Sequence, residues 1–257
     1  MKEKISPLKS RPLRNPGQSL QDEIDKIFDQ SILIHITAPI IFIYLAGMTW
    51  FYKYTNHIPS PIFISIIAGI VTIYCFIRVI FLKKKINQLK HARDGEKAVG
   101  QYLENFRTKG DVVYHDVIGG QFNIDHVIVS THGIFVIETK TYSKPKGVEP
   151  KIVYSANNIK IDQYNSGKKL IIQAKCESKW LKDMLKTSTG KEFDIQAVIV
   201  FPGWFIETRD RQNLSDVWVL NPKALRAFIS NSKEVISNED MKIAAYHISR
   251  YIRTYDA

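Results

Sequence analysis

An aspartate, a glutamate and a lysine are the residues of this chain whose types and spacing best suit chemistry: Asp125, Glu138 and Lys140. Two carboxylates can hold a hard divalent cation such as Mg²⁺ or Mn²⁺, which polarises a phosphate group. A lysine beside them can orient or deprotonate an attacking water and stabilise the negative charge that develops. Together these groups could hydrolyse a phosphodiester bond. The spacing alone also fits a solvated sheet face with an ordinary Glu/Lys pair.

The surrounding sequence predicts that these three residues face one another. Asp125 lies in one run rich in β-branched and aromatic residues, and Glu138 and Lys140 lie in the next, after a short break at 131–133. This pattern is typical of a β-hairpin. With His132-Gly133 as the loop, Asp125 lies opposite Lys140, and alternation puts all three side chains on one face. The carboxylates are then diagonal neighbours about 7 Å apart, and a one-residue change in the loop would turn one strand over.

Two helices are expected beside this hairpin. The first begins after Asp94-Gly95, and Glu96 in its first turn points inward with the apolar face formed by Val99, Tyr102, Leu103 and Phe106. An acid at this position can also serve only as a favourable partner of the helix dipole. The second helix covers residues 170–186, and Gln173 lies at the flank of its apolar side, within reach of an adjoining cleft.

The order of the remaining elements predicts the fold class. Strands are expected near residues 112–114, 151–154, 159–161, 195–201 and 217–220, and terminal helices near 222–229 and 239–253. The run at 195–201 is nearly continuously apolar, which is typical of a central or parallel strand. The order therefore favours an α/β domain with a mixed sheet and helices on both sides.

Two long apolar stretches precede this domain. Residues 32–52 and 58–77 contain no Asp, Glu, Lys or Arg, and each has about the 20 residues that a helix needs to cross a membrane. We therefore expect an integral membrane protein with a helical hairpin, of the bacterial inner-membrane or plasma-membrane type. Two buried helices of a soluble bundle are the alternative. A cleaved signal peptide does not fit, because the polar residues 1–31 come first and no small-residue cleavage site follows the first span.

Charge predicts the orientation of this hairpin. Basic residues precede the first span and follow the second, whereas the expected loop, residues 53–59, holds only Lys53. The positive-inside rule therefore places both termini and the globular domain in the cytoplasm. The net charge of +11 is compatible with a polyanionic substrate, although juxtamembrane lysines also serve topology and anionic lipid. Cys75 and Cys176 suggest neither a disulfide framework nor a thiolate metal site.

These features divide the chain into four expected segments. They are a cytoplasmic tail at 1–31, a transmembrane hairpin at 32–82, a basic linker at 83–93 and a globular domain at 94–257 with its core at 94–203. The tail is expected to be flexible to residue 18 and helical from Ser19. An apolar stripe on that short helix suits either the membrane surface or docking of the globular domain: Leu20, Ile24, Ile27 and Phe28.

Three sequence blocks in this order resemble the nuclease-related domain (NERD), a branch of the PD-(D/E)xK nuclease superfamily. They are Gly95-Glu96-x-x-Val99, Asn123-Ile-Asp-His-Val-Ile-Val129 and Gly133-Ile-Phe-Val-Ile-Glu-Thr-Lys140. The resemblance is strongest over residues 94–142 and weaker to about 201. It implies a restriction-endonuclease-like fold in which a mixed central sheet is flanked by helices. It also implies site roles: metal-binding acids Asp125 and Glu138, accessory acid Glu96, catalytic lysine Lys140 and a glutamine on the following helix, Gln173.

The chain departs from the family pattern at two places. Ile124 stands where the superfamily name has proline, and the helix with Gln173 lacks the Asn-Pro that often precedes it. His126 matches the histidine that follows the aspartate in this family. Its parity places it on the strand face opposite Asp125, which favours packing over metal ligation.

The sequence therefore predicts a membrane-anchored, Mg²⁺- or Mn²⁺-dependent nuclease that acts on nucleic acid, DNA rather than RNA. A binding or scaffold protein that keeps the fold without hydrolysis is the alternative from another class. A third reading makes the membrane hairpin an oligomerising effector, but the spans hold no acid and no evident small-xxx-small motif. The expected partners are nucleic acid and the lipid bilayer, and no motif identifies a homo-oligomer or a regulatory protein.

Overall fold

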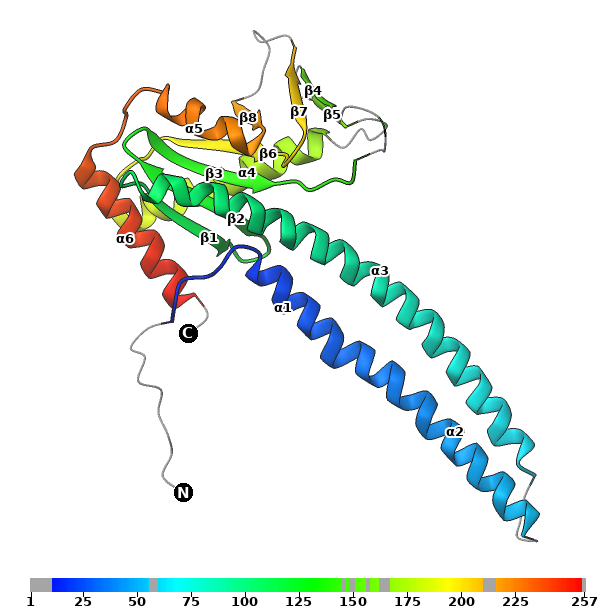
Figure 1. The fold of residues 1–257 in the computed structure, drawn as a ribbon. Coiled ribbons are helices and arrows are strands. Elements are labelled where there is room, and N and C mark those ends of the chain that lie inside the picture. Colours follow the sequence, from blue (N-terminus) through cyan, green and yellow to red (C-terminus); the bar gives the residue numbers. More distant parts are fainter. Residues whose placement is uncertain are drawn as a thin grey trace, which may run out of the picture. The chain divides into compact units, whose positions relative to one another are not determined.

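A computed structural model gives the structure of this chain (Figure 1). It describes residues 11–55, 60–144, 147, 151–155, 158–161, 167–209 and 216–255. The chain divides into two compact units, a helical unit at Ser19–His91 and a globular unit that combines the residues up to Gln18 with those from Ala92 onward. The globular unit thus takes residues from both sides of the helical one.

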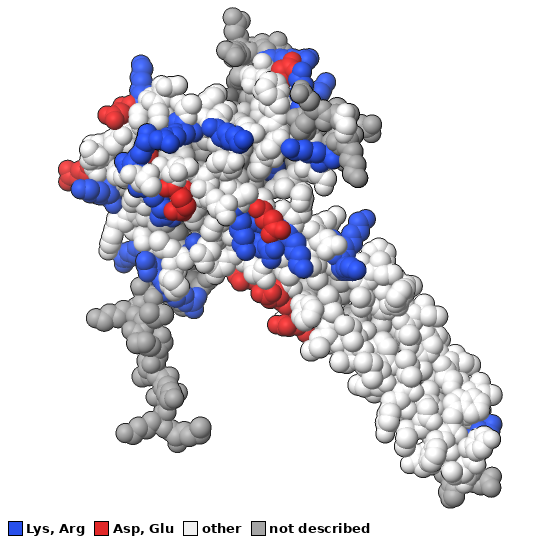
Figure 2. All heavy atoms as spheres, viewed as in Figure 1, with Lys and Arg blue, Asp and Glu red and all other residues white. Residues whose placement is uncertain are grey.

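The helical unit consists of two long helices. One runs continuously through α1 (Gln18–Ile27), a π-helical stretch (η1, Phe28–Ile32) and α2 (Leu33–Tyr54), and the other is the first part of α3 (Ile62–Arg107). Both are long and apolar enough to cross a membrane. Figure 2 shows almost no charged side chains on α2 and the facing part of α3. Of the expected loop, Lys53 lies inside α2, and residues 56–59 lie outside the described residues.

The expected short helix at the start of this unit does not stand alone, because α1 continues into α2. Ile24 and Ile27 are buried against Ile86 of α3, whereas Phe28 is 55% exposed. Glu23 also pairs with Lys85 of α3 at 2.7 Å. The apolar stripe therefore covers a neighbouring helix, which neither sequence-based interpretation had foreseen.

Helix α3 is continuous from Ile62 to Arg107, so residues 83–93 are helical and no new helix begins at Asp94-Gly95. A glycine inside a helix costs about 1 kcal/mol relative to alanine, but here it permits close packing. A Cβ atom at Gly95 would collide with the side chain of Thr141. Val99, Leu103 and Phe106 are buried as predicted, whereas Tyr102 is 41% exposed, and its assignment to the inward face was wrong.

A mixed five-stranded sheet forms the centre of the globular unit, in the order β1-β2-β3-β6-β8. The pairs β1-β2 and β2-β3 are antiparallel, and β3-β6 and β6-β8 are parallel. This confirms the predicted α/β fold with a mixed sheet. The strands are β1 (Val112–Ile118), β2 (Asn123–Ser130), β3 (Gly133–Thr139), β6 (Ile195–Val200) and β8 (Val217–Leu220).

Helices cover both faces of this sheet (Figure 1). They are α4 (Gly167–Thr189) and α6 (Asn238–Thr254) on one face, and the end of α3 with α5 (Pro222–Ser230) on the other. Successive strand residues pack into opposite helical layers. Val127 belongs to the same core cluster as Leu181 of α4, and Ile128 to that of Leu103 of α3. The strands are therefore apolar on both faces, as in a sheet buried between two helical layers.

The hairpin β2-β3 has a different register from the predicted one. Ser130 pairs with Gly133, so the two-residue loop is Thr131-His132 instead of His132-Gly133. Gly133, with a φ angle of 130°, enters β3 in a conformation that only glycine adopts easily. Continuing the register places Asp125 across from Glu138 instead of Lys140. The loop keeps its length, so the shift preserves the parity of the two strands.

A second, three-stranded sheet lies beside the first, in the order β5-β4-β7. Its strands are β5 (Asn158–Ile161), β4 (Lys151–Ser155) and β7 (Phe205–Thr208). The sequence predicted β4 and β5 but missed β7, which pairs in parallel with β4. Ile152 and Ile159 pack against Leu170 and Ala174 of α4, so this sheet holds the start of α4 in place.

Candidate active site

Asp125, Glu138 and Lys140 come together where β2 begins and β3 ends. The Asp125 Oδ2 atom accepts a hydrogen bond of 2.7 Å from the backbone N–H of Thr139, which fixes this carboxylate against β3. Lys140 Nζ donates to Glu138 Oε1 in a short contact. Asp125 and Glu138 are only 9% and 4% exposed. The structure thus gathers two buried carboxylates and one ammonium group in one place.

Gln173 of α4 joins this group. Its Oε1 accepts from Lys140 Nζ at 3.1 Å, and its Nε2 donates to Glu138 Oε1 at 2.9 Å. The Gln173 amide therefore holds both Glu138 of β3 and Lys140, which directly follows this strand. The absence of an Asn-Pro before α4 does not keep Gln173 from the site, and residues 162–166, where part of that departure falls, lie outside the described residues.

Glu96 reaches the same region from α3, and it points inward as predicted, with 7% of its surface exposed. Burial, with the charges of Asp116 and Glu138, raises the pKa of Glu96 to about 8 against the opposing charge of Lys140. This carboxylate is thus electrostatically coupled to the acids and the lysine at the end of the sheet. The site therefore receives a polar side chain from each helical layer: Glu96 from α3 and Gln173 from α4.

Glu177 belongs to the site but was missing from the sequence-based interpretation. It is 1% exposed, and its Oε1 accepts from Gln173 Nε2 at 2.8 Å. Burial raises the pKa of Glu177 to about 9, with a further contribution from the charge of Glu138. A signal was present: Glu177 lies three residues after Ala174 and four before Leu181, in the buried row of α4. Carboxylates rarely occupy such a row without a partner.

These acids form a donor set that suits a hard cation. Burial and the charges of Glu138 and Glu96 hold the pKa of Asp125 well above its ordinary value. Glu138 Oε2 and Glu177 Oε2 are buried and have no hydrogen-bond partner among the described residues. Carboxylate oxygens are the ligands that Mg²⁺ prefers, so a cation would relieve both the repulsion and the unsatisfied oxygens. Within the described parts of the chain, however, no three His, Cys, Asp or Glu side chains are already arranged to hold a metal ion.

The buried carboxylate of Glu177 should make the stability of the metal-free protein depend on pH. Its pKa lies near 9 when folded against an ordinary 4.5, so its stabilising contribution is complete below pH 4.5 and is lost as the pH rises toward 9. We expect the melting temperature in EDTA to fall between pH 5 and 9, and to fall less in Glu177→Gln, whose amide stays neutral. Glu96 leaves a residual slope of the same sign. An equally steep fall in the variant would contradict this assignment.

The N-terminal strap, residues 11–17, also reaches the site. The Gly17 backbone N–H lies near enough to the Glu96 carboxylate to lower its pKa. Gly17 has a φ angle of 69° and leaves no room for a Cβ atom, which would lie 2.8 Å from Arg93 Cγ. Pro16 packs on Gly100 with equally little space. The expected flexible tail is therefore part of the globular unit over these residues, while residues 1–10 lie outside the described residues.

Arg14 of the strap neutralises a further buried acid. Its Nε atom donates to Asp116 Oδ2 at 2.6 Å, and the two side chains are 14% and 3% exposed. Asp116 has a φ angle of 52°, a rare conformation for a residue other than glycine. It lies beside Asp125, because the pairs His115–His126 and Val117–Ile124 bracket the two aspartates. Sequence reasoning had no means of finding this pair, whose members are 102 residues apart.

Removing this ion pair should destabilise the globular unit. We expect Arg14→Ala to lower the free energy of unfolding by about 3 kcal/mol, because it removes the guanidinium group that pairs with the buried Asp116 carboxylate. Adding Asp116→Asn to Arg14→Ala should recover most of that loss, since the buried carboxylate is replaced by a neutral amide of the same shape. Thermal unfolding of the full-length variants measures both effects. A double variant as unstable as Arg14→Ala would mean that the strap acts only by packing.

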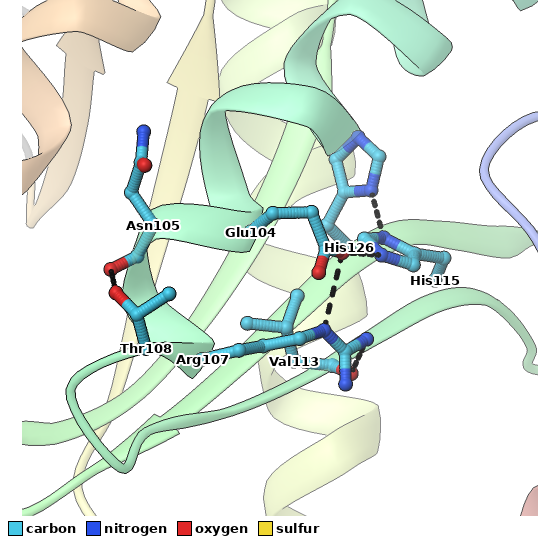
Figure 3. Close-up of polar contacts among 7 residues, drawn as sticks. All are labelled: Glu104, Asn105, Arg107, Thr108, Val113, His115 and His126. Carbon is cyan, nitrogen blue, oxygen red and sulfur yellow. Dashed lines mark hydrogen bonds and ion pairs between the residues drawn. The ribbon is translucent and has the colours of Figure 1, made fainter.

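His126 follows Asp125 in β2, so its side chain lies on the other face of the strand. There it meets His115 (Figure 3). It is fully buried, and its Nδ1 lies 2.8 Å from Nδ1 of His115, so one ring donates and the other accepts. Burial lowers the pKa of His126 well below its ordinary value, and His115 adds to the effect. His115 in turn faces Glu104, which accepts from Arg107 at 3.1 Å. His126 thus packs within a neutral pair, apart from the acids.

Comparison with protein families matches residues 91–202 to the nuclease-related domain, NERD. This stretch contains Lys140 and the residues gathered around it: Glu96, Asp125, Glu138, Gln173 and Glu177. The strap residues Arg14 and Gly17 lie outside it. The match confirms the resemblance seen in the sequence. Comparisons with curated proteins and with solved structures gave no match.

Proposed function

We propose that this chain, which carries a nuclease-related domain at residues 91–202, is a membrane-anchored, metal-dependent nuclease. It hydrolyses phosphodiester bonds of nucleic acid, with DNA as the preferred substrate. One observation carries the proposal: Asp125, Glu138, Lys140 and Gln173 converge at the end of the sheet in a hydrogen-bonded group. Nothing in packing requires so many buried polar groups in one place, and their burial is costly.

The acids would hold a divalent cation, Mg²⁺ or Mn²⁺. Asp125 and Glu138 would bind it, and Glu96 would bind it directly or through water. Two observations support this assignment: the buried Oε2 of Glu138 has no hydrogen-bond partner in the described part of the chain, and the pKa values of Asp125 and Glu96 are raised. Such a cation supplies positive charge that polarises the phosphate and stabilises the transition state.

Lys140 would act on the attacking water. Its ammonium group is held by Glu138 and Gln173, and the adjacent carboxylates raise its pKa. A lysine kept charged suits the orientation of the nucleophile and the stabilisation of negative charge better than proton abstraction. Gln173 would fix the direction of the ammonium group through its carbonyl oxygen, while its amide group keeps Glu138 in place.

The two long helices would anchor the domain in a membrane. Side chains such as Ile40, Tyr44, Ile70 and Phe76 are more than half exposed along them, which suits contact with lipid. The basic residues that flank both spans support a cytoplasmic position for the termini and the nuclease domain. In this arrangement the substrate is nucleic acid in the cytoplasm.

The experiment that tests this function uses the full-length protein in lipid nanodiscs, because the strap must be present. We expect labelled single- and double-stranded DNA, and to a lesser extent RNA, to be cut with Mg²⁺ or Mn²⁺ and not with EDTA. Glu138→Gln, prepared identically, is the blank for contaminating nucleases. Absence of cutting, together with salt-sensitive DNA binding, would instead favour a catalytically silent binding or scaffold protein.

A further inference from the structure

A groove separate from the acids lies between α4 and α6. It encloses about 580 Å³, a volume in the range of small-molecule and nucleotide sites. The two helices run in opposite directions, because Trp180 of α4 contacts Tyr251 of α6 while Lys191, just past α4, pairs with Asp240 at the start of α6. The groove is lined from α4 by Trp180, Asp183, Met184, Thr187 and Ser188, and from α6 by four further residues.

The row from α6 offers cationic and aromatic groups. His247, Arg250, Tyr251 and Thr254 line the groove and follow the spacing of one helix face. Arg250 is exposed, and its guanidinium group makes no hydrogen bond or ion pair with any residue that the structure describes. A free guanidinium group beside an imidazole suits an anion such as phosphate.

The row from α4 leads from the groove to the acids. Gln173, Glu177, Trp180 and Met184 follow one another at intervals of four, three and four residues, so they occupy one flank of the helix. The first two belong to the candidate active site, and the last two line the groove. The rise per residue separates Gln173 from Trp180 by roughly 10 Å along the helix, a distance of a few nucleotides at most.

An aromatic chain adds a second link to the site. Trp180 contacts Phe122 with ring centroids 5.6 Å apart, and Phe122 precedes Asn123, the first residue of the strand that carries Asp125. Trp180 and Tyr251 are also in edge contact, at 5.4 Å. Aromatic side chains beside basic groups are the arrangement by which proteins hold single-stranded nucleic acid without regard to sequence.

We propose that this groove is a nucleotide subsite that holds a single-stranded segment of the substrate next to the acids. Trp180 and Tyr251 contact the base, and Arg250 and His247 contact the phosphate. Ser188 and Thr254 also line the groove, and their hydroxyl groups would face the sugar-phosphate backbone. The inference rests on the proposed function for its substrate class, but binding at the groove needs neither a metal nor hydrolysis.

The test measures binding without cleavage. Full-length Asp125→Asn protein in nanodiscs is titrated, in EDTA, into a fluorescein-labelled single-stranded 12-mer of thymidine, and anisotropy gives Kd. Arg250→Gln should raise Kd about 5-fold. It should also reduce the slope of log Kd against log salt concentration by about 0.7 for the one phosphate contact that is lost. Trp180→Leu should raise Kd about 10-fold. Lys182→Gln, with the same loss of charge two residues from Trp180 and on another face of α4, should change it little.

A second measurement separates a nucleotide site from an anion site. Thymidine monophosphate should raise the melting temperature more than inorganic phosphate does. In Arg250→Gln the two ligands should raise it equally. If Arg250→Gln binds the 12-mer like Lys182→Gln, or if phosphate protects as well as the nucleotide, the subsite is overturned. A failure of the proposed function looks different: cleavage would then survive Glu138→Gln while the effects at Arg250 and Trp180 remained.

Discussion

Asp125→Asn is expected to lower the rate of nucleic-acid cleavage by about 10³-fold, with the fold intact. The asparagine oxygen can still accept the hydrogen bond from the Thr139 N–H, which the aspartate makes at 2.7 Å. The variant therefore removes the negative charge and little else. Because that charge would hold the cation, Mn²⁺ affinity should fall together with the rate. Single-turnover cleavage and calorimetric Mn²⁺ titration of the full-length protein measure the two effects.

A matched control comes from the other end of the sheet. Asp194 is exposed and precedes β6, which starts beside the beginning of β3. Asp194→Asn makes the same chemical change far from the C-terminal end of β3, and it should leave both the rate and the Mn²⁺ affinity unchanged. Cleavage by Asp125→Asn at the rate of this control would exclude a metal site built on Asp125.

Lys140→Gln is expected to lower the maximal rate by about 10²–10⁴-fold, with a smaller change in KM. Its ammonium group contacts Glu138 and Gln173, so it is already aimed at the place where the acids meet. A role in positioning the nucleophile acts in the transition state, and such an interaction affects kcat more than substrate binding. Steady-state kinetics over a range of substrate concentrations separates the two constants.

The melting temperature distinguishes this role from a structural one. Loss of Lys140 leaves Glu138, which is 4% exposed, without its counter-charge, and this should destabilise the metal-free protein. Added Mn²⁺ should restore the melting temperature of Lys140→Gln, because the cation replaces the missing charge, but it should not restore the rate. Lys144→Gln, at an exposed position four residues on, is the control for loss of a lysine. Recovery of the rate with Mn²⁺ would reduce Lys140 to a structural partner of Glu138.

The hairpin illustrates how far local patterns can carry a prediction. Alternation of apolar residues and the glycine near the loop identified both strands, and the parity of the two strands survived the error in register. The register itself depends on which residues close the loop. Gly133 takes a positive φ angle of 130° as the first residue of β3, a choice that no sequence period reveals.

Helix α3 shows the opposite case. Asp94-Gly95 looked like a helix boundary because glycine disfavours helices, yet the helix runs through it. Its neighbour there is Thr141, which comes after β3 and occupies the space that a Cβ atom would fill. Contact with a residue 46 positions away cannot be read from local propensity.

The sequence by itself determined the two apolar spans, the mixed α/β order and the proximity of Asp125, Glu138 and Lys140, because all three follow from local periodicity and charge. Only the tertiary structure decided that Glu177 joins Gln173 at the site, that Arg14 and Gly17 reach the acids from the N-terminal strap, and that α4 and α6 enclose a groove. Those features depend on packing between segments far apart in the chain, and such packing leaves no period in the sequence.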